Sequence, residues 1–396
     1  MEATQNGVRA VRRLTLVVLL AALLLPATAS AADSIYWGNE FNAIRVGNLA
    51  GTGAQDVVAG KPCGVAIDAA AGKIYWANWD QGKIQRADLD VTDADNDGPD
   101  VQTLFDAPDN HLCGVAVDPG NNKIYWANFS SDEIRVGNLQ GTSTSTLFRD
   151  PAGSAPSGVA IDPAAGKIYW TNQFTDQVRV GNLDGSGTAS TLFGRDAAVP
   201  TVERNPIGVA INPAAGKIYW TDLGSCCSGP GQVRVGNLDG TGASTLFGDE
   251  ISPGGLAIDP GANRIYWATF GGGAIRSGNL SGTGTASSLF STESNPLFPA
   301  LLRKPLSTEP PEVVGGAKTG KMHVCSQGSW APDLLGAFLF RAPASFAYQW
   351  EMDGSKIATG ATFTPTAAGN YTCTVRAKNQ AGETSRTSAV KKVKVR

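Results

Sequence analysis

Short apolar runs alternate with glycine-rich turns along residues 33–303, and the same pattern returns six times. The stretch from Gly208 to Phe247 shows one complete copy, with four runs that read GVAI, KIYW, VRVGNL and STLF. Runs of this length rich in Val, Ile, Tyr and Trp predict β-strands, and no ten residues follow helical spacing. A repeat of 39 to 50 residues built from four short strands is typical of a β-propeller blade. The Tyr-Trp pairs that mark the copies begin at Tyr36, Tyr75, Tyr125, Tyr169, Tyr219 and Tyr266.

The first copy lacks its innermost run. Ser34 to Val58 supplies the second, third and fourth runs, whereas a GVAI-type run precedes each of the five later copies. Phe298 to Leu302 follows the last copy and has the apolar character of the missing strand. We predict that this segment pairs with the first copy and closes the ring, so that no blade keeps an open edge. The predicted fold class is all-β, with a six-bladed β-propeller over residues 32–303 and a C-terminal β-sandwich.

Residues 1–31 have the pattern of a secretory signal peptide. Arginines precede an apolar run from Leu14 to Pro26, and Ala29-Ser30-Ala31 offers a cleavage site. About 13 apolar residues are too few to span a bilayer. We therefore expect a secreted, extracellular or cell-surface protein with no membrane span after the signal is removed.

Charge differs between the parts of the chain. Residues 311–396 hold 11 Lys and Arg against 5 Asp and Glu, whereas residues 32–310 carry a net charge of -11. An acidic ring argues against nucleic acid as its partner. Lys391, Lys392, Lys394 and Arg396 alternate along the last predicted strand. They either protect a sheet edge or attach the chain to an acidic polymer.

One copy matches a known repeat closely. Tyr219-Trp220-Thr221-Asp222 spells YWTD between a GVAI run and the run from Val233 to Gly240. This arrangement resembles the class B repeats of the low-density-lipoprotein receptor, whose six copies build a six-bladed propeller. The resemblance implies that the fourth motif residue ties neighbouring blades together. In the other copies an amide or hydroxyl must make that contact: Asn39, Asn78, Asn128, Asn172 and Thr269. GVAVD at Gly114 to Asp118 also resembles NHL-type repeats.

Large side chains follow the motif in every copy, on loops that share one face of a propeller. Either they fill gaps between blades, or they form a docking surface for an extracellular protein or glycan. These candidate ligand-binding residues are Phe41, Trp79, Phe129, Phe174, Leu223 and Phe270.

An arginine also recurs, in the third run of five copies. We expect it to pair with a repeated Asp or a backbone carbonyl between blades, and the alternative is an inner basic ring. The positions are Arg45, Arg135, Arg179, Arg234 and Arg276, with Gln85 in the remaining copy.

One copy carries an acidic loop that the others lack. Alternate carboxylates before a glycine resemble the start of a calcium-binding loop, although Leu104 stands where an EF-hand has its bidentate glutamate. The loop is either a calcium site or a solvated turn. Its candidate ligands are Asp93, Asp95, Asp97 and Asp100.

Six cysteines suit an exported chain. Cys63 and Cys113 precede GVA in consecutive copies and either bridge neighbouring blades or remain thiols. The adjacent Cys226 and Cys227 either form a vicinal disulfide or bind metal.

The chain changes character after Arg303. Residues 304–316 are rich in proline and predict a linker. In residues 317–396, Cys325, Trp350 and Cys373, with Tyr371 just before the second cysteine, resemble the immunoglobulin fold. The resemblance implies a Cys325–Cys373 disulfide. An apolar insert from Leu334 to Phe346 is either exposed or forms a flap packed on the sandwich or the propeller.

The two histidines, His111 and His323, offer no visible pair for acid-base chemistry. We therefore expect a binding protein rather than an enzyme, without a cofactor other than calcium. The alternative is a hydrolase or lyase with a metal site in the central channel.

Overall fold

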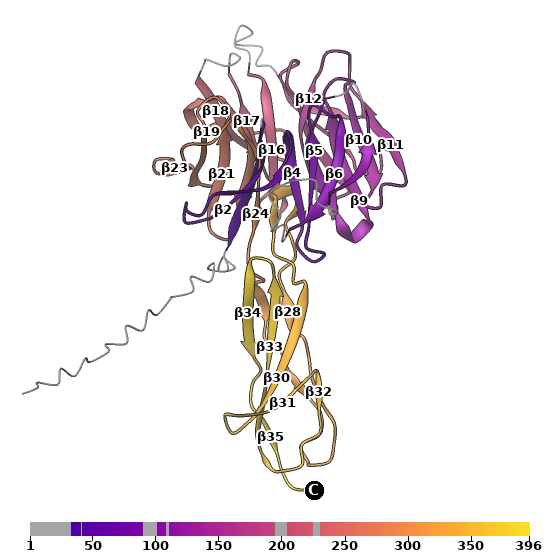
Figure 1. Cartoon of the computed structure of the whole chain (residues 1–396), viewed down its shortest axis with the longest axis vertical. Helices are drawn as coiled ribbons and strands as arrows, with labels where there is room; N and C mark the ends of the chain where they lie inside the picture. Colours follow the sequence, from indigo (N-terminus) through magenta and orange to yellow (C-terminus); the bar gives the residue numbers. More distant parts are fainter. Residues whose placement is uncertain (1–32, 41, 90–100, 108–110, 195–203, 225–229) are drawn as a thin grey trace, which may run out of the picture. The chain divides into compact units, whose positions relative to one another are not determined.

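The structure is a computed structural model in which residues 33–40, 42–89, 101–107, 111–194, 204–224 and 230–396 are described. Those residues form β-strands joined by turns, with three short 3-10 helices, η1 (Pro119–Asn121), η2 (Pro213–Ala215) and η3 (Leu335–Ala337), among them. Five four-stranded sheets and a sheet that contains the first strand form a propeller-like set, coloured indigo to orange in Figure 1. We call each of these sheets a blade.

Within a blade, antiparallel neighbours follow one another from the inner strand outward. The first blade consists of β24 (Pro296–Leu302), β1 (Ser34–Asn39), β2 (Ala43–Asn48) and β3 (Gln55–Ala59). The next two are β4 (Pro62–Asp68), β5 (Lys73–Asn78), β6 (Lys83–Asp88), β7 (Gln102–Asp106), and β8 (Leu112–Asp118), β9 (Lys123–Asn128), β10 (Glu133–Asn138), β11 (Thr144–Arg149). The remaining three are β12 (Pro156–Asp162), β13 (Lys167–Asn172), β14 (Gln177–Asn182), β15 (Ser190–Phe193); β16 (Pro206–Asn212), β17 (Lys217–Asp222), β18 (Pro230–Asn237), β19 (Ser244–Ile251); and β20 (Pro253–Asp259), β21 (Arg264–Thr269), β22 (Ala274–Asn279), β23 (Ser287–Phe290).

The first blade combines the early and late segments of the chain. β24 pairs antiparallel with β1, so that Ser34 lies opposite Leu302 and Asn39 opposite Pro296. The prediction that Phe298 to Leu302 supplies the missing inner strand is therefore confirmed.

Glycines let the inner strands approach one another closely. A Cβ atom at Gly158 would lie 2.5 Å from the carbonyl oxygen of Ile207 in the next inner strand. Built Cβ atoms at the equivalent glycines would lie 2.3–2.7 Å from backbone atoms of the neighbouring strand. The glycine of the GVAI run is thus required by the contact between blades. The equivalent positions are Gly64, Gly114, Gly208 and Gly255.

Aromatic stacking joins the outer parts of the blades. A phenylalanine of the outermost strand packs on the motif tryptophan of the next blade, with ring centroids 4.7–5.2 Å apart. Third-strand glycines make room for these rings, since a Cβ at Gly181 would lie 2.5 Å from Phe148. Val58 takes the register position of the phenylalanine in the first blade, and Ala87 takes that of the glycine in the next. Val58 is smaller than the phenylalanine of the other blades, and Ala87 is larger than the glycine of the other blades. The pairs are the tilted Phe290–Trp37 and the stacked Phe105–Trp126, Phe148–Trp170, Phe193–Trp220 and Phe247–Trp267.

Most of the C-terminal strands form separate small sheets. Cys325 and Cys373 are joined by a disulfide with Cα atoms 6.1 Å apart, and Trp350 is fully buried in the same cluster. The Tyr371 hydroxyl donates a hydrogen bond to the carbonyl of Ala367 at 2.9 Å. The disulfide that the immunoglobulin resemblance implied is therefore present. The strands are β25 (Ser307–Glu309), β26 (Val313–Val314), β27 (His323–Cys325), β28 (Ser329–Trp330), β29 (Leu339–Phe340), β30 (Ser345–Met352), β31 (Ser355–Thr359), β32 (Thr362–Phe363), β33 (Gly369–Asn379), β34 (Gly382–Thr387) and β35 (Lys391–Val393).

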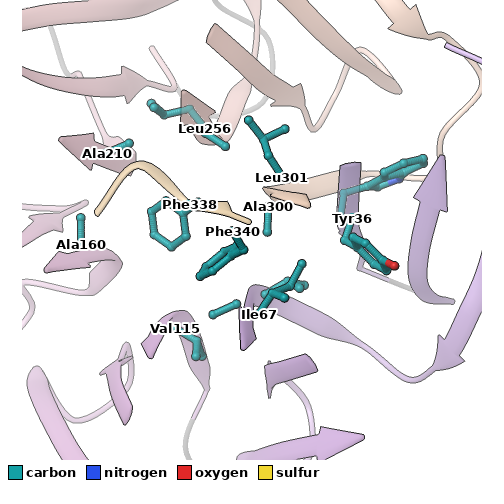
Figure 2. Close-up of a cluster of buried hydrophobic side chains, with 14 of the residues drawn as sticks. Tyr36, Ile67, Val115, Ala160, Ala210, Leu256, Ala300, Leu301, Phe338 and Phe340 are labelled. Atoms are coloured by element: carbon teal, nitrogen blue, oxygen red, sulfur yellow. The ribbon is translucent and has the colours of Figure 1, made fainter. Parts of the chain in front are cut away.

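Part of the apolar insert enters the propeller core, and we call residues 334–340 the plug. β29 pairs parallel with β24, with Leu339 opposite Leu301. Figure 2 shows Phe338 and Phe340 among side chains of the inner strands, and each is at most 5% exposed. A Cβ at Gly336 would lie 2.4 Å from Ile211, so only glycine fits there. Of the two possibilities for the insert, a flap packed on the propeller is confirmed.

Candidate functional site

An apolar pocket of about 260 Å³ lies where the first residues of the inner strands meet the loops that follow the motif strands. The inner strands and the loops each contribute one set of lining residues, which we call the inner and outer sets. The inner set is Cys63, Cys113, Ser157, Ile207, Gly254, Leu297 and Phe298. The outer set is Glu40, Trp79, Phe129, Gln173, Leu223 and Phe270, joined by Ser252.

Bulges in the inner strands position the inner set. The pairing register shifts between Pro156 and Val159, and equivalent shifts occur in the other inner strands. A bulge changes the direction of side chains locally, and the residue just before the repeated glycine of the GVAI run, such as Ser157, lines the pocket. Sequence reasoning missed this set. Its signal is the position before the repeated glycine, which is Cys in two copies and Ser, Ile or Gly in the other three.

Cys63 and Cys113 form a disulfide between neighbouring inner strands, with Cα atoms 4.8 Å apart. Both cysteines are buried and belong to the pocket lining. The bridging alternative is therefore the one that the structure contains. By linking two blades, the disulfide holds one side of the pocket together.

The structure brings four of the six predicted ligand-binding residues together. Trp79, Phe129, Leu223 and Phe270 line the pocket. Phe174 lies beside it, with its ring centroid 5.5 Å from that of Phe129 and 58% of its surface exposed. Phe41 is outside the described residues.

An aromatic row extends from the pocket along neighbouring loops. The Trp79 ring is 4.6 Å from the His111 ring and 5.1 Å from the Phe129 ring, centroid to centroid. His111 is exposed, and its Nδ1 lies 2.9 Å from the Ser130 hydroxyl. The row ends at the exposed Phe174, so the apolar surface continues from the pocket to solvent.

Glu40 is the single charged residue among the described residues that line the pocket. Burial raises its pKa above the usual value, and the Asn295 amide, which donates to Glu40 Oε2 at 3.3 Å, partly opposes this shift. A neighbouring ion pair joins Lys61 and Asp80. The pocket thus combines an apolar interior with one carboxylate.

The repeated arginine pairs with an acid in five blades, but the predicted partner, a repeated Asp between blades, is found only in part. Three of the acids are Glu, and Glu133 and Asp222 belong to the same blade as their arginines. In three blades the same acid also accepts a hydrogen bond from the motif tryptophan, as Asp150 does from Trp170 Nε1 at 2.7 Å. Glu293, Asp150 and Glu250 come from the end of the preceding blade or the link after it, so these contacts join blades. The ion pairs are Arg45–Glu293 at 2.9 Å, Arg135–Glu133 at 3.2 Å, Arg179–Asp150 at 2.6 Å, Arg234–Asp222 at 3.4 Å and Arg276–Glu250 at 3.2 Å.

The fourth motif residue makes different contacts where it is an amide: Asn39 Nδ2 donates to the Glu293 carboxylate at 3.3 Å, whereas two others make neutral contacts. Asn78 Nδ2 donates to Gln85 at 3.2 Å, and Asn128 Oδ1 accepts from the Ser131 amide at 3.3 Å. Asp222 is the charged exception, near Arg204 and Arg234.

We predict that Asp222 makes stability depend on pH. Burial raises its pKa to about 6, although Arg234 and Arg204 oppose the shift. Because the folded pKa lies above the ordinary value, the buried charge costs stability above pH 6, and this cost is relieved as the pH falls toward 4. Relative to Asp222→Asn, the parent should gain about 2 kcal/mol of unfolding free energy between pH 7 and pH 4. Urea denaturation of both proteins at each pH measures the change in unfolding free energy between the two pH values. Any loss of ion pairs in Asp222→Asn that does not depend on pH cancels in this change. A parallel pH dependence in the two proteins would contradict the prediction.

Two predicted sites fall on residues that the structure does not describe. The calcium-loop candidates Asp93, Asp95, Asp97 and Asp100, and the pair Cys226 and Cys227, belong to these residues. In the described ranges, no group of three or more His, Cys, Asp or Glu side chains is placed to hold a metal ion. At the plug, Phe338 and Phe340 lie among apolar side chains that include Ile67, Val115 and Leu256.

Solved structures with this fold serve different functions. The propeller of a nidogen/laminin complex matches with a TM-score of 0.56 at 18% identity, over 68% of this chain and 98% of that chain. TolB from Acinetobacter baumannii matches with a TM-score of 0.53 at 13% identity, over 69% of this chain and 67% of that one. At these identities the likeness shows the fold. A search of curated protein sequences finds no match.

The expectation that the chain is not an enzyme is contradicted. Structures with the fold include the periplasmic gluconolactonase of Pseudomonas aeruginosa, at 11% identity and a TM-score of 0.48 over 68% of this chain and 98% of that one. They also include putative 6-phosphogluconolactonases from two Bacteroides species and virginiamycin B lyase from Staphylococcus aureus. The scarcity of histidine was the wrong criterion, because one fold can host both enzymes and binding proteins.

The repeat itself is recognised in one stretch of the chain. Residues 122–163 match the family model of the low-density lipoprotein receptor repeat class B. The stretch begins before the motif strand β9 and ends after the next inner strand, β12. The chain therefore contains one stretch that is similar to the class B repeat of the low-density lipoprotein receptor, within a propeller-like, nearly all-β fold.

Proposed function

We propose that this chain is an exported protein whose six-bladed YWTD-type propeller, over residues 32–303, binds an extracellular protein through the apolar pocket. Residues 304–316 would be a linker, and residues 317–396 an immunoglobulin-like domain that acts as a spacer or second contact. Two disulfides are compatible with an oxidising compartment. Within the described residues, none of the helices has the length and apolar character needed to cross a membrane.

The observation that carries the proposal is the convergence of Trp79, Phe129, Leu223 and Phe270 on one pocket. Small-molecule sites usually measure about 300–1,000 Å³. A pocket of about 260 Å³ is therefore suited to one or two bulky side chains of a partner rather than to a whole ligand. Affinity at protein interfaces is concentrated in such anchors.

The exposed Phe174 supports a protein partner, because it extends the apolar surface beyond the pocket. The nidogen/laminin structure supports the same choice, since a propeller of this fold occurs there in a complex between two proteins. A glycan would instead require several polar groups at the pocket, whereas the lining is mainly apolar.

Selection of peptides from a phage-displayed random library on the full chain tests the proposal. Selected peptides should share an aromatic or large aliphatic residue and compete with one another. Trp79→Ala and Phe270→Ala remove lining residues from the loops of two different blades. Each should weaken binding more than about 30-fold, as loss of an anchor contact does. Binding is measured by fluorescence polarisation with the selected peptides.

Ile357→Ala is the matched control, because Ile357 is a partly exposed apolar residue on β31, outside the pocket. It should leave binding unchanged. Thermal unfolding of each variant verifies that the fold is retained. Peptides that bind the two pocket variants as tightly as the parent would rule out the pocket as the docking site.

A further inference from the structure

Four cations form one face of the C-terminal strands, and we call Lys318, Lys392, Lys394 and Arg396 the lysine face. Lys392, Lys394 and Arg396 are exposed, whereas Val393 between the first two is buried. Alternate residues of a strand share a face and lie about 6.6 Å apart. Lys318 stands beside Lys394 in a parallel bridge. Three of the cations therefore follow one another along the chain, and Lys318 lies beside them on the neighbouring segment.

Protection of a sheet edge does not explain these charges. β35 pairs with β33 on one side, with Val393 opposite Gly369. On the other side, Lys394 donates its amide to Ala317 at 2.9 Å and accepts the Thr319 amide at 2.9 Å. The backbone at Lys394 is thus already paired with residues 317–319, so edge protection does not account for the charge at this position.

The lysine face is also uncompensated. None of its four cations forms an ion pair with a carboxylate in the described part of the chain. Asp353 is the nearby acid by register, and its Oδ1 accepts hydrogen bonds from the backbone and side chain of Asn370, opposite Lys392. Other lysines of these sheets face acids directly: Lys356 lies opposite Glu351, and Lys378 opposite Glu383.

We propose that the lysine face binds a linear acidic polysaccharide. Regularly spaced ammonium groups along an extended strand suit carboxylates that recur along an extended polymer, and such contacts need no pocket. Single-stranded nucleic acid is disfavoured, because Phe174 on the propeller is the one large exposed aromatic residue described, so bases have no platform on which to stack.

The test uses biolayer interferometry with immobilised polygalacturonate and the full chain as analyte, from 25 to 300 mM NaCl. The parent should bind with an affinity that falls as salt rises. Lys318→Gln/Lys392→Gln/Lys394→Gln should weaken binding at least tenfold at the lowest salt. It should also reduce the slope of log Kd against log salt by about two, since fewer counterions are released.

Lys123→Gln/Lys356→Gln/Lys378→Gln is the matched control, because it removes the same number of charges from other exposed positions. It should keep most of the affinity. An equal loss in the control would show that net charge alone attracts the polymer and would overturn the proposal. Absence of binding by the parent, or tighter binding to a single-stranded oligonucleotide or to anionic phosphatidylglycerol vesicles, would overturn it as well. The pocket variants Trp79→Ala and Phe270→Ala should bind the polymer normally, which separates this site from the proposed protein-binding site.

Discussion

Phe340→Ala and Phe338→Ala are each expected to lower the free energy of unfolding by about 3–5 kcal/mol, the cost of emptying a large buried aromatic site. Both rings lie in the propeller core among residues of several inner strands. The surrounding strands are held by glycine contacts and by hydrogen bonds within each sheet, so they cannot collapse into the space. Urea denaturation followed by tryptophan fluorescence and circular dichroism measures the loss.

Phe346→Ala is the control for this prediction. Phe346 belongs to the same C-terminal strands, where it is partly exposed and packs on Trp330. Phe346→Ala should lower the free energy of unfolding by less than the plug variants do, because removal of a partly exposed ring leaves a smaller cavity. If Phe340→Ala costs no more than Phe346→Ala, the plug contributes little to the stability of the ring.

Gly158→Val should reduce the free energy of unfolding by more than about 4 kcal/mol, in the range seen when a core is strongly overpacked. The added Cβ would meet the Ile207 carbonyl oxygen at 2.5 Å and the Val209 nitrogen at 3.0 Å. Because both are backbone atoms of a neighbouring inner strand, no side-chain movement relieves the clash. Relief would require the two blades to separate.

Gly248→Ala provides the comparison. A Cβ there would meet Thr245 at 3.8 Å, an ordinary contact, and the backbone has no positive φ. Its stability should change by less than about 1 kcal/mol. Thermal unfolding of both variants measures the difference, and a Gly158→Val protein as stable as the parent would show that the inner strands are not packed as described.

The repeated strands and the way the first blade closes were predictable from sequence, because every copy repeats the same apolar and glycine positions. The assignment of Phe298 to Leu302 needed only the observation that one copy lacked a run. The plug was not assignable in this way. Its contacts join residues 334–340 to strands that begin as early as residue 62, and no local pattern specifies a partner so distant in the chain.

The candidate site was predictable in part. Trp79, Phe129, Leu223 and Phe270 follow a recognisable motif, and this fixed offset places them on neighbouring loops. The inner set depends on bulges, which alternation of apolar and polar residues does not indicate. Likewise the acids that pair with the repeated arginines, such as Asp150 and Glu293, come from links whose length varies between copies.

The pairing of β24 with β1 determines when the ring can be completed during synthesis. Ser34 leaves the ribosome long before Leu302, its partner in the first blade. Until then β1 has no inner neighbour, and contacts so remote in sequence form slowly. A nascent chain must therefore keep this strand from pairing with other molecules while nearly all of the ring is made, so association with a chaperone at this stage would suppress aggregation.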